Sequence, residues 1–140
     1  MDRSRSDEEK SLEGQAQEQL AETLYATAEL HDARGDYYQA TKLYHESMQL
    51  RLFVYSSKEG SADDSKVRHS NMVHCGMCLV GMGGVYLKQE DYVEAHKVFN
   101  KALNFCKAHG VQHDHVIMNL IRTRLAQAQR LVRMKTPAEI

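Results

Sequence analysis

The fold is decided by a stretch that the chain contains twice. Residues 35–44 read GDYYQATKLY, and residues 90–99 read EDYVEAHKVF, 55 positions further along. Asp, Tyr, Ala and Lys coincide in the two copies, and a Leu/Val pair and a Tyr/Phe pair match in kind. The similarity continues on both sides of each stretch. The sequence therefore indicates one helical hairpin written twice.

Small side chains recur where two antiparallel helices would face each other. They are Ala28 and Ala40 in the first copy and Gly83 and Ala95 in the second. Such positions let helix axes approach closely, and the cluster Gly81, Gly83 and Gly84 is expected to serve the same purpose. Asp36 and Asp91 stand where each second helix would begin, so they are expected to accept hydrogen bonds from its first free N–H groups.

These residues carry a resemblance to a known family. The second copy, with Leu79, Gly83, Tyr86, Ala95 and Phe99, resembles the tetratricopeptide repeat, a helix-turn-helix unit of 34 residues. The first copy matches through Leu24, Ala28, Gly35, Tyr37, Ala40 and Tyr44. The spacing of 55 is closer to the longer-helix, kinesin-light-chain style of the repeat. The resemblance implies hairpins stacked as a short right-handed superhelix of about two repeats plus a capping helix.

The pattern predicts an all-α chain of five helices. We expect them over residues 13–34, 36–56, 63–88, 91–109 and 111–134, which gives hairpins at 13–56 and 63–109 and a capping helix at the end. Residues 1–12 are polar and lack apolar periodicity, so a disordered tail is expected there, and a second short tail over 135–140.

Charge and composition limit the classes of partner that we expect for this chain. The formal net charge is -1, yet residues 1–64 hold 7 basic and 14 acidic side chains, while residues 97–140 hold 8 and 2. Near-neutrality argues against nucleic acid as a partner, and the oppositely charged ends make self-association conceivable. No apolar run is long enough to cross a bilayer. Three cysteines without a signal peptide predict a cytoplasmic protein without disulfides.

The resemblance places a binding surface on the concave face made by the first helix of each hairpin. The residues expected there are Tyr25, Glu29, Asp32, Val73, Met77 and Val80. Family members that hold the acidic tail of a heat-shock chaperone use a Lys/Asn/Arg clamp. Tyr25 and Glu29 stand where the clamp has Lys and Asn, which excludes that ligand. Arg122, Arg130 and Arg133 on the amphipathic last helix form a candidate second surface.

A zinc site is the alternative hypothesis. Cys75 and Cys78 form a CxxC, and Cys106 and His109 form a CxxH, which together supply the four donors of a structural zinc site. Against it, no turn-forming residues surround the cysteines, and small buried cysteines are common between helices. No arrangement of a nucleophile with a base is recognisable. We therefore expect a non-catalytic protein-binding adaptor or assembly subunit without a cofactor; the alternative is a zinc-stabilised helical protein.

Overall fold

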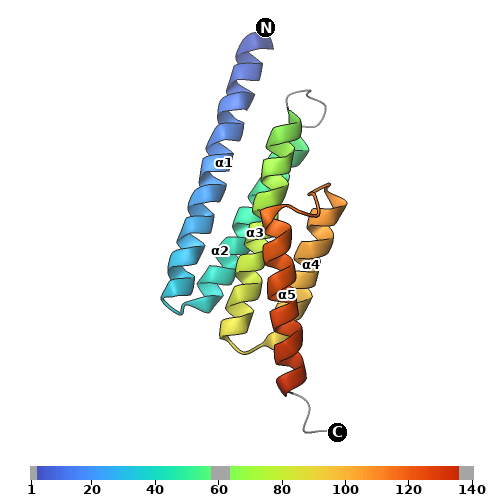
Figure 1. The fold of residues 1–140 in the computed structure, drawn as a ribbon. Helices are drawn as coiled ribbons and strands as arrows, with labels where there is room; N and C mark the ends of the chain where they lie inside the picture. Colours follow the sequence, from blue (N-terminus) through green and yellow to red (C-terminus); the bar gives the residue numbers. More distant parts are fainter. Residues whose placement is uncertain (1–2, 58–63, 136–140) are drawn as a thin grey trace.

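Five antiparallel helices make up the computed structural model, which describes residues 3–57 and 64–135 (Figure 1). They are α1 (Arg3–Ala33), α2 (Tyr37–Ser57), α3 (Asp64–Lys88), α4 (Tyr92–Ala108) and α5 (Val116–Lys135). Each helix packs against the next one along the chain, and α3 also contacts α1 and α5. Helices α1, α3 and α5 therefore form one layer, and α2 and α4 form the other. The expected all-α fold is confirmed.

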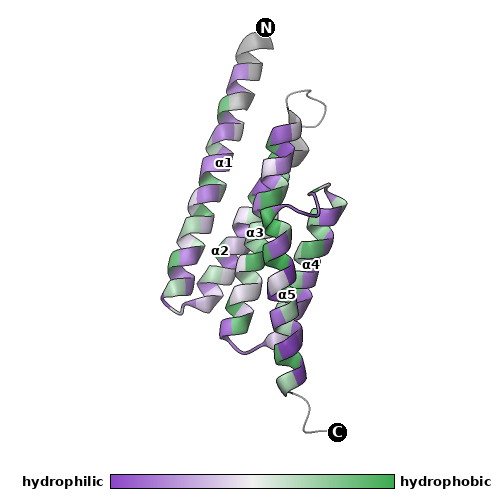
Figure 2. Ribbon diagram, in the orientation of Figure 1, coloured by the Kyte–Doolittle hydropathy of each residue, from purple (hydrophilic) through white to green (hydrophobic). Residues whose placement is uncertain are grey.

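The core runs between the two layers. Its largest fully buried side chains include Met72 and Leu79 of α3, Phe99 of α4, and Met118 and Ile121 of α5. Figure 2 shows more hydrophobic residues along α3, in the middle of its layer, than along the outer helix α1. This distribution follows from position, because α3 has neighbours on several sides and α1 packs mainly against α2.

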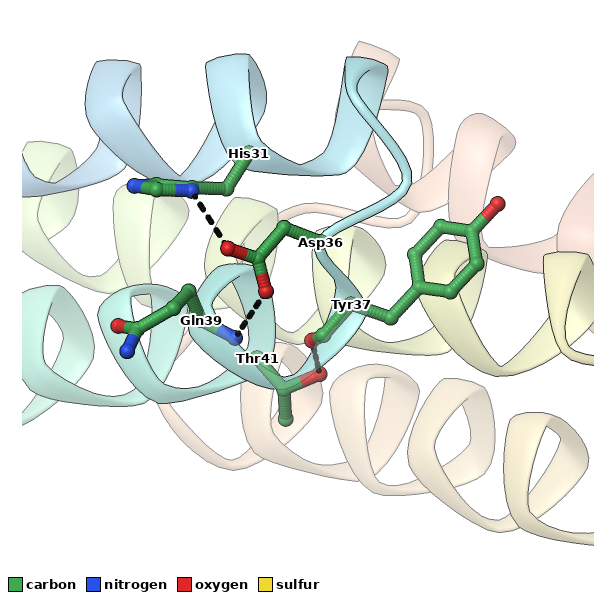
Figure 3. A network of polar contacts seen from close by, with 5 residues as sticks. All are labelled: His31, Asp36, Tyr37, Gln39 and Thr41. Carbon is green, nitrogen blue, oxygen red and sulfur yellow. Dashed lines mark hydrogen bonds and ion pairs between the residues drawn. The ribbon is translucent and has the colours of Figure 1, made fainter.

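The turn between α1 and α2 is closed by hydrogen bonds at both helix ends (Figure 3). Gly35 adopts a φ of +80°, and the Asp36 backbone N–H donates to the His31 carbonyl oxygen at 2.9 Å, which ends α1 as a Schellman motif. Asp36 then serves both helices. One carboxylate oxygen accepts from the Gln39 backbone N–H at 3.4 Å, and the other lies 3.2 Å from Nδ1 of His31.

The turn between α3 and α4 repeats this arrangement 55 residues later. The Asp91 backbone N–H donates to the Tyr86 carbonyl oxygen at 2.9 Å, and the Asp91 carboxylate accepts from the Glu94 backbone N–H at 3.4 Å. The two aspartates expected to cap helices do so. The sequence repeat is thus a repeat of hydrogen bonds. Glu90 takes the place of Gly35, with a φ of +61°.

Glu90 provides a test of this equivalence. A side chain with a Cβ is strained in the left-handed region, at a cost of about 1 kcal/mol. We expect Glu90→Gly to raise the free energy of unfolding by up to that amount, and Gly35→Ala to lower it by a similar amount, in urea titrations. Two changes of the same sign would show that the two turns are not equivalent.

Glycines of α3 admit aromatic rings from both neighbouring helices. A Cβ built on Gly81 would lie 2.7 Å from Cε1 of Tyr44 in α2, and one built on Gly83 would lie 2.7 Å from Cζ of Phe99 in α4. Both rings are buried. The expected close approach is confirmed at these two glycines. It is wrong for Gly84, where an added Cβ would meet nothing within 4 Å.

Two predicted boundaries are corrected. Helix α1 begins at Arg3 and not at residue 13, so residues 3–12 are helical where a disordered tail was expected. Leu12 is 65% exposed there, and Glu8 and Glu9 are exposed as well. A helix can continue through such positions because extending a helix is far easier than starting one. Helix α5 begins at Val116 and not at 111. The predicted tail over 135–140 falls outside the described residues apart from Lys135, which is helical.

The start of α5 has a local cause. Nδ1 of His115 accepts a hydrogen bond from the Ile117 backbone N–H at 3.1 Å, which satisfies a free donor of the first turn. Gly110, with a φ of +79°, ends α4, and buried Val111 anchors the intervening loop. Residues 111–115 therefore belong to the loop that connects the antiparallel helices α4 and α5, and not to α5.

Candidate binding groove

Two adjoining hollows lie along the layer of α1, α3 and α5. The larger, of about 410 Å³, is bounded by all three helices. The smaller, of about 340 Å³, lies between α1 and α3, with α2 contributing its inner wall. Tyr25 lines both. We call the two hollows together the inner groove.

Most residues expected on the concave face line this groove. Tyr25, Asp32 and Val80 line the larger hollow, and Glu29 and Met77 line the smaller one together with Tyr25. Val73 lines neither hollow; it is half-buried against the core.

The larger hollow has an ion pair on one side and a cation on the other. Asp32 of α1 forms an ion pair of 2.7 Å with Nζ of Lys88 in α3, which ties the two helices together at that end. Arg124, Gln127 and Leu131 of α5 line the opposite wall. The charge of Asp32 is therefore already compensated, and Arg124 is the cation of α5 that borders the groove.

The Tyr25 side chain gives the groove an aromatic surface, supported from beneath by buried Tyr44. The rings of Tyr25 and Tyr44 meet edge to face with centroids 5.3 Å apart. Burial, with a smaller contribution from the nearby negative charge of Glu29, raises the pKa of Tyr25 to about 12. Its hydroxyl is therefore a neutral hydrogen-bonding group at the groove surface.

The smaller hollow contains a buried cation. Arg51 of α2 is 7% exposed, and its Nη1 donates to Oδ1 of Asn71 at 3.3 Å. Half-buried His74 lines the same hollow. Burial lowers the pKa of His74, and the positive charge of Arg51 lowers it further, while Glu22 and Glu18 act in the opposite direction. The imidazole is thus held towards its neutral form.

The three arginines predicted as a second surface have different surroundings. Arg122 is tied to the loop before α5, since its Nη2 donates to the His113 carbonyl oxygen at 2.7 Å and to Oδ1 of Asn119 at 2.6 Å. Arg130 is exposed. Arg133 lines a separate hollow of about 260 Å³ between α4 and α5. The Arg122 side chain is therefore already engaged by hydrogen bonds within the chain.

The four candidate zinc ligands are not assembled. Sγ of Cys75 lies 3.8 Å from the Met48 carbonyl oxygen, towards α2, whereas Sγ of Cys106 would lie 2.7 Å from a Cβ built on Gly76. His109 is exposed, and its ring stacks on Phe105 with centroids 4.4 Å apart. Among the described residues, no group of three or more His, Cys, Asp or Glu is placed to hold a metal ion. The three cysteines are accounted for by packing in the core.

The buried thiols lead to a prediction about pH. Burial raises the thiol pKa from 9.0 to about 12 at Cys75 and to about 11 at Cys78 and Cys106. Above pH 9 the unfolded chain loses these protons before the folded one does, so the free energy of unfolding should fall as pH rises from 9 to about 12. Urea titrations across this range should show the fall, and a triple Cys→Ala variant should show a shallower one. An equal slope in both would refute the assignment.

Neither a membrane-spanning helix among the described residues nor a known relative points to a function. None of the helices in the described part of the chain combines the length and apolar character needed to span a membrane. Comparisons with models of protein families, with curated protein sequences and with solved structures found no match.

Proposed function

We propose that this protein is a non-catalytic binding module that holds a peptide or helix of another protein in the inner groove. The supporting observation is the groove itself, whose two hollows share Tyr25 as a lining residue and are also lined by the half-buried side chains of Met77 and Val80. Apolar surface ringed by a few charged groups is what a recognised segment requires.

We further propose that the hairpins stack as in tetratricopeptide repeats, with α5 as the cap. Two features support this arrangement. The turns at Asp36 and Asp91 have matching hydrogen bonds, and helices α1, α3 and α5 share one layer. In such a stack the first helices of successive hairpins form the inner surface.

Gly84 allows the groove to be blocked without disturbing the core. It lines the larger hollow, and an added Cβ meets nothing within 4 Å. Gly84→Arg should therefore keep or raise stability, since arginine favours helix over glycine, while its side chain fills the groove. Asn104→Arg, on the exposed side of α4, is the matched control.

The test uses peptides selected from a random library on the immobilised wild-type protein. We expect the selected peptides to bind Gly84→Arg at least about tenfold more weakly, which is about 1.4 kcal/mol, and to bind Asn104→Arg with unchanged affinity. Peptides that bind both variants equally well, or a selection that enriches none, would contradict the proposal.

A further inference from the structure

The floor of the smaller hollow has an incompletely satisfied charge. Arg51 keeps 7% of its surface exposed. Its described hydrogen bond goes to the Asn71 amide oxygen, and its Nε–H has no hydrogen-bond partner among the described residues. A buried guanidinium without a carboxylate costs folding free energy, because neither water nor a counter-charge replaces its hydration. The Nε–H of Arg51 is therefore a hydrogen-bond donor that a ligand in the smaller hollow could use.

The rim of the same hollow has the opposite charge. Glu22 and Glu29 of α1 line it from the solvent side, and both are exposed. They are seven residues apart, so they lie on the same side of α1, two helical turns from each other. Tyr25 and Ala26 lie between them and also line the hollow. A bare anion would meet this acidic rim first and be repelled.

The floor and the rim of the hollow therefore favour ligand groups of opposite charge. The floor at Arg51 favours a negatively charged acceptor, and the rim at Glu22 and Glu29 favours positive charge. A peptide segment satisfies both when an acidic side chain points inwards and basic residues one turn before and one turn after it stay at the surface. On a helix these three positions share one face. At about 340 Å³, the hollow has room for such a side chain.

We propose that the smaller hollow is an anchor pocket for an acidic side chain of the bound segment, whose carboxylate is held by Arg51 while basic neighbours face Glu22 and Glu29. This inference rests on the proposed function, because it names the chemistry of the segment that the groove would hold. Arg51 is a specificity-determining residue in this account.

The test uses capped helical peptides of alanine and leucine that carry one central residue between two lysines placed one turn before and one turn after it. The central residue is glutamate, glutamine or phosphoserine. We expect the glutamate peptide to shift the Nε–Hε resonance of Arg51 saturably, and to bind about tenfold more tightly than the glutamine peptide, the ratio expected when a charge-assisted hydrogen bond of about 1.4 kcal/mol is lost.

The Arg51→Met variant separates recognition from folding. It should bind the glutamate and glutamine peptides equally and keep the circular dichroism spectrum of the wild type, because methionine removes the guanidinium at similar length, while the removal of the buried charge and the loss of the hydrogen bond to Asn71 have opposite effects on stability. Arg124→Met, in the larger hollow, should retain the preference for glutamate.

Several outcomes would overturn the inference. They are an unresponsive Arg51 resonance, a preference for phosphoserine over glutamate, or a glutamate preference that persists in Arg51→Met. Failure of the glutamate peptide to bind would also overturn it. The proposed function is judged separately, by whether Gly84→Arg abolishes binding of the library-selected peptides, so the groove can be upheld while the anchor is rejected.

Discussion

We expect Gly83→Ala to lower the free energy of unfolding by about 3 kcal/mol, as overpacking of a filled core does. The added methyl group would lie 2.7 Å from Cζ of Phe99, 2.8 Å from Cδ1 and closer still to Cε1. Phe99 is fully buried, so its ring has no free space into which it can move. Either α3 and α4 separate or the ring leaves its place, and both options lose packing. Urea-induced unfolding followed by circular dichroism measures the change.

The neighbouring glycine is the control. Gly84→Ala makes the same chemical change one residue later in the same helix, where the added Cβ has open space. It should raise the free energy of unfolding by up to about 1 kcal/mol, because alanine favours helix. Equal effects at the two positions would mean that α3 and α4 do not approach through Gly83.

The second large effect is expected in α5. Ile121 is fully buried in the main core cluster together with residues of α3 and α4. Ile121→Ala should cost about 3 kcal/mol, through lost burial and the cavity left behind. The size of this effect measures whether α5 is an integral part of the stack or a helix that can be dispensed with.

Val116 offers the comparison within the same helix, since it is 79% exposed. Val116→Ala should change the free energy of unfolding by less than about 0.5 kcal/mol. A small effect at Ile121, close to that at Val116, would show that α5 does not pack as described.

Periodicity predicted the helices well where they pack against others. The boundaries of α2, α3 and α4 fall within about two residues of the expected ones, because each is set by a repeated local feature such as the capping aspartate at 36 or 91. The first turns of α1 carry no apolar pattern. Apolar periodicity indicates which residues pack against other helices, and it does not indicate helical conformation itself. It therefore could not predict that α1 begins at Arg3.

The residues that line the inner groove were predicted in part. The repeat fixes which side of α1 and α3 faces the groove, so Tyr25, Met77 and Val80 could be named from the sequence. Arg124, which lines the larger hollow, was missed. The apolar pattern of the last helix separates its buried side from its exposed side, but it does not show where α5 crosses α3, and that crossing decides which exposed cation borders the groove. Arg122 was predicted for a separate surface. Arg122 instead contacts the preceding loop.

Arg51 was missed for a different reason. It belongs to α2, in the other layer, and a single arginine in an amphipathic helix is ordinarily solvent-exposed. Its burial depends on how three helices meet, which no local pattern records. The one sequence signal is that Arg51 lies seven residues after Tyr44, which is itself buried, and therefore on the core side of α2.

The most direct measurement of the central claim is chemical-shift mapping of a library-selected peptide on the isotope-labelled protein. We expect the backbone amides of Val80, Gly81, Gly84 and Gln127 to shift together and to saturate at one affinity. Unchanged signals there, with shifts instead at Tyr38 of α2 or Asn104 of α4, would place binding on the outer layer and contradict the account.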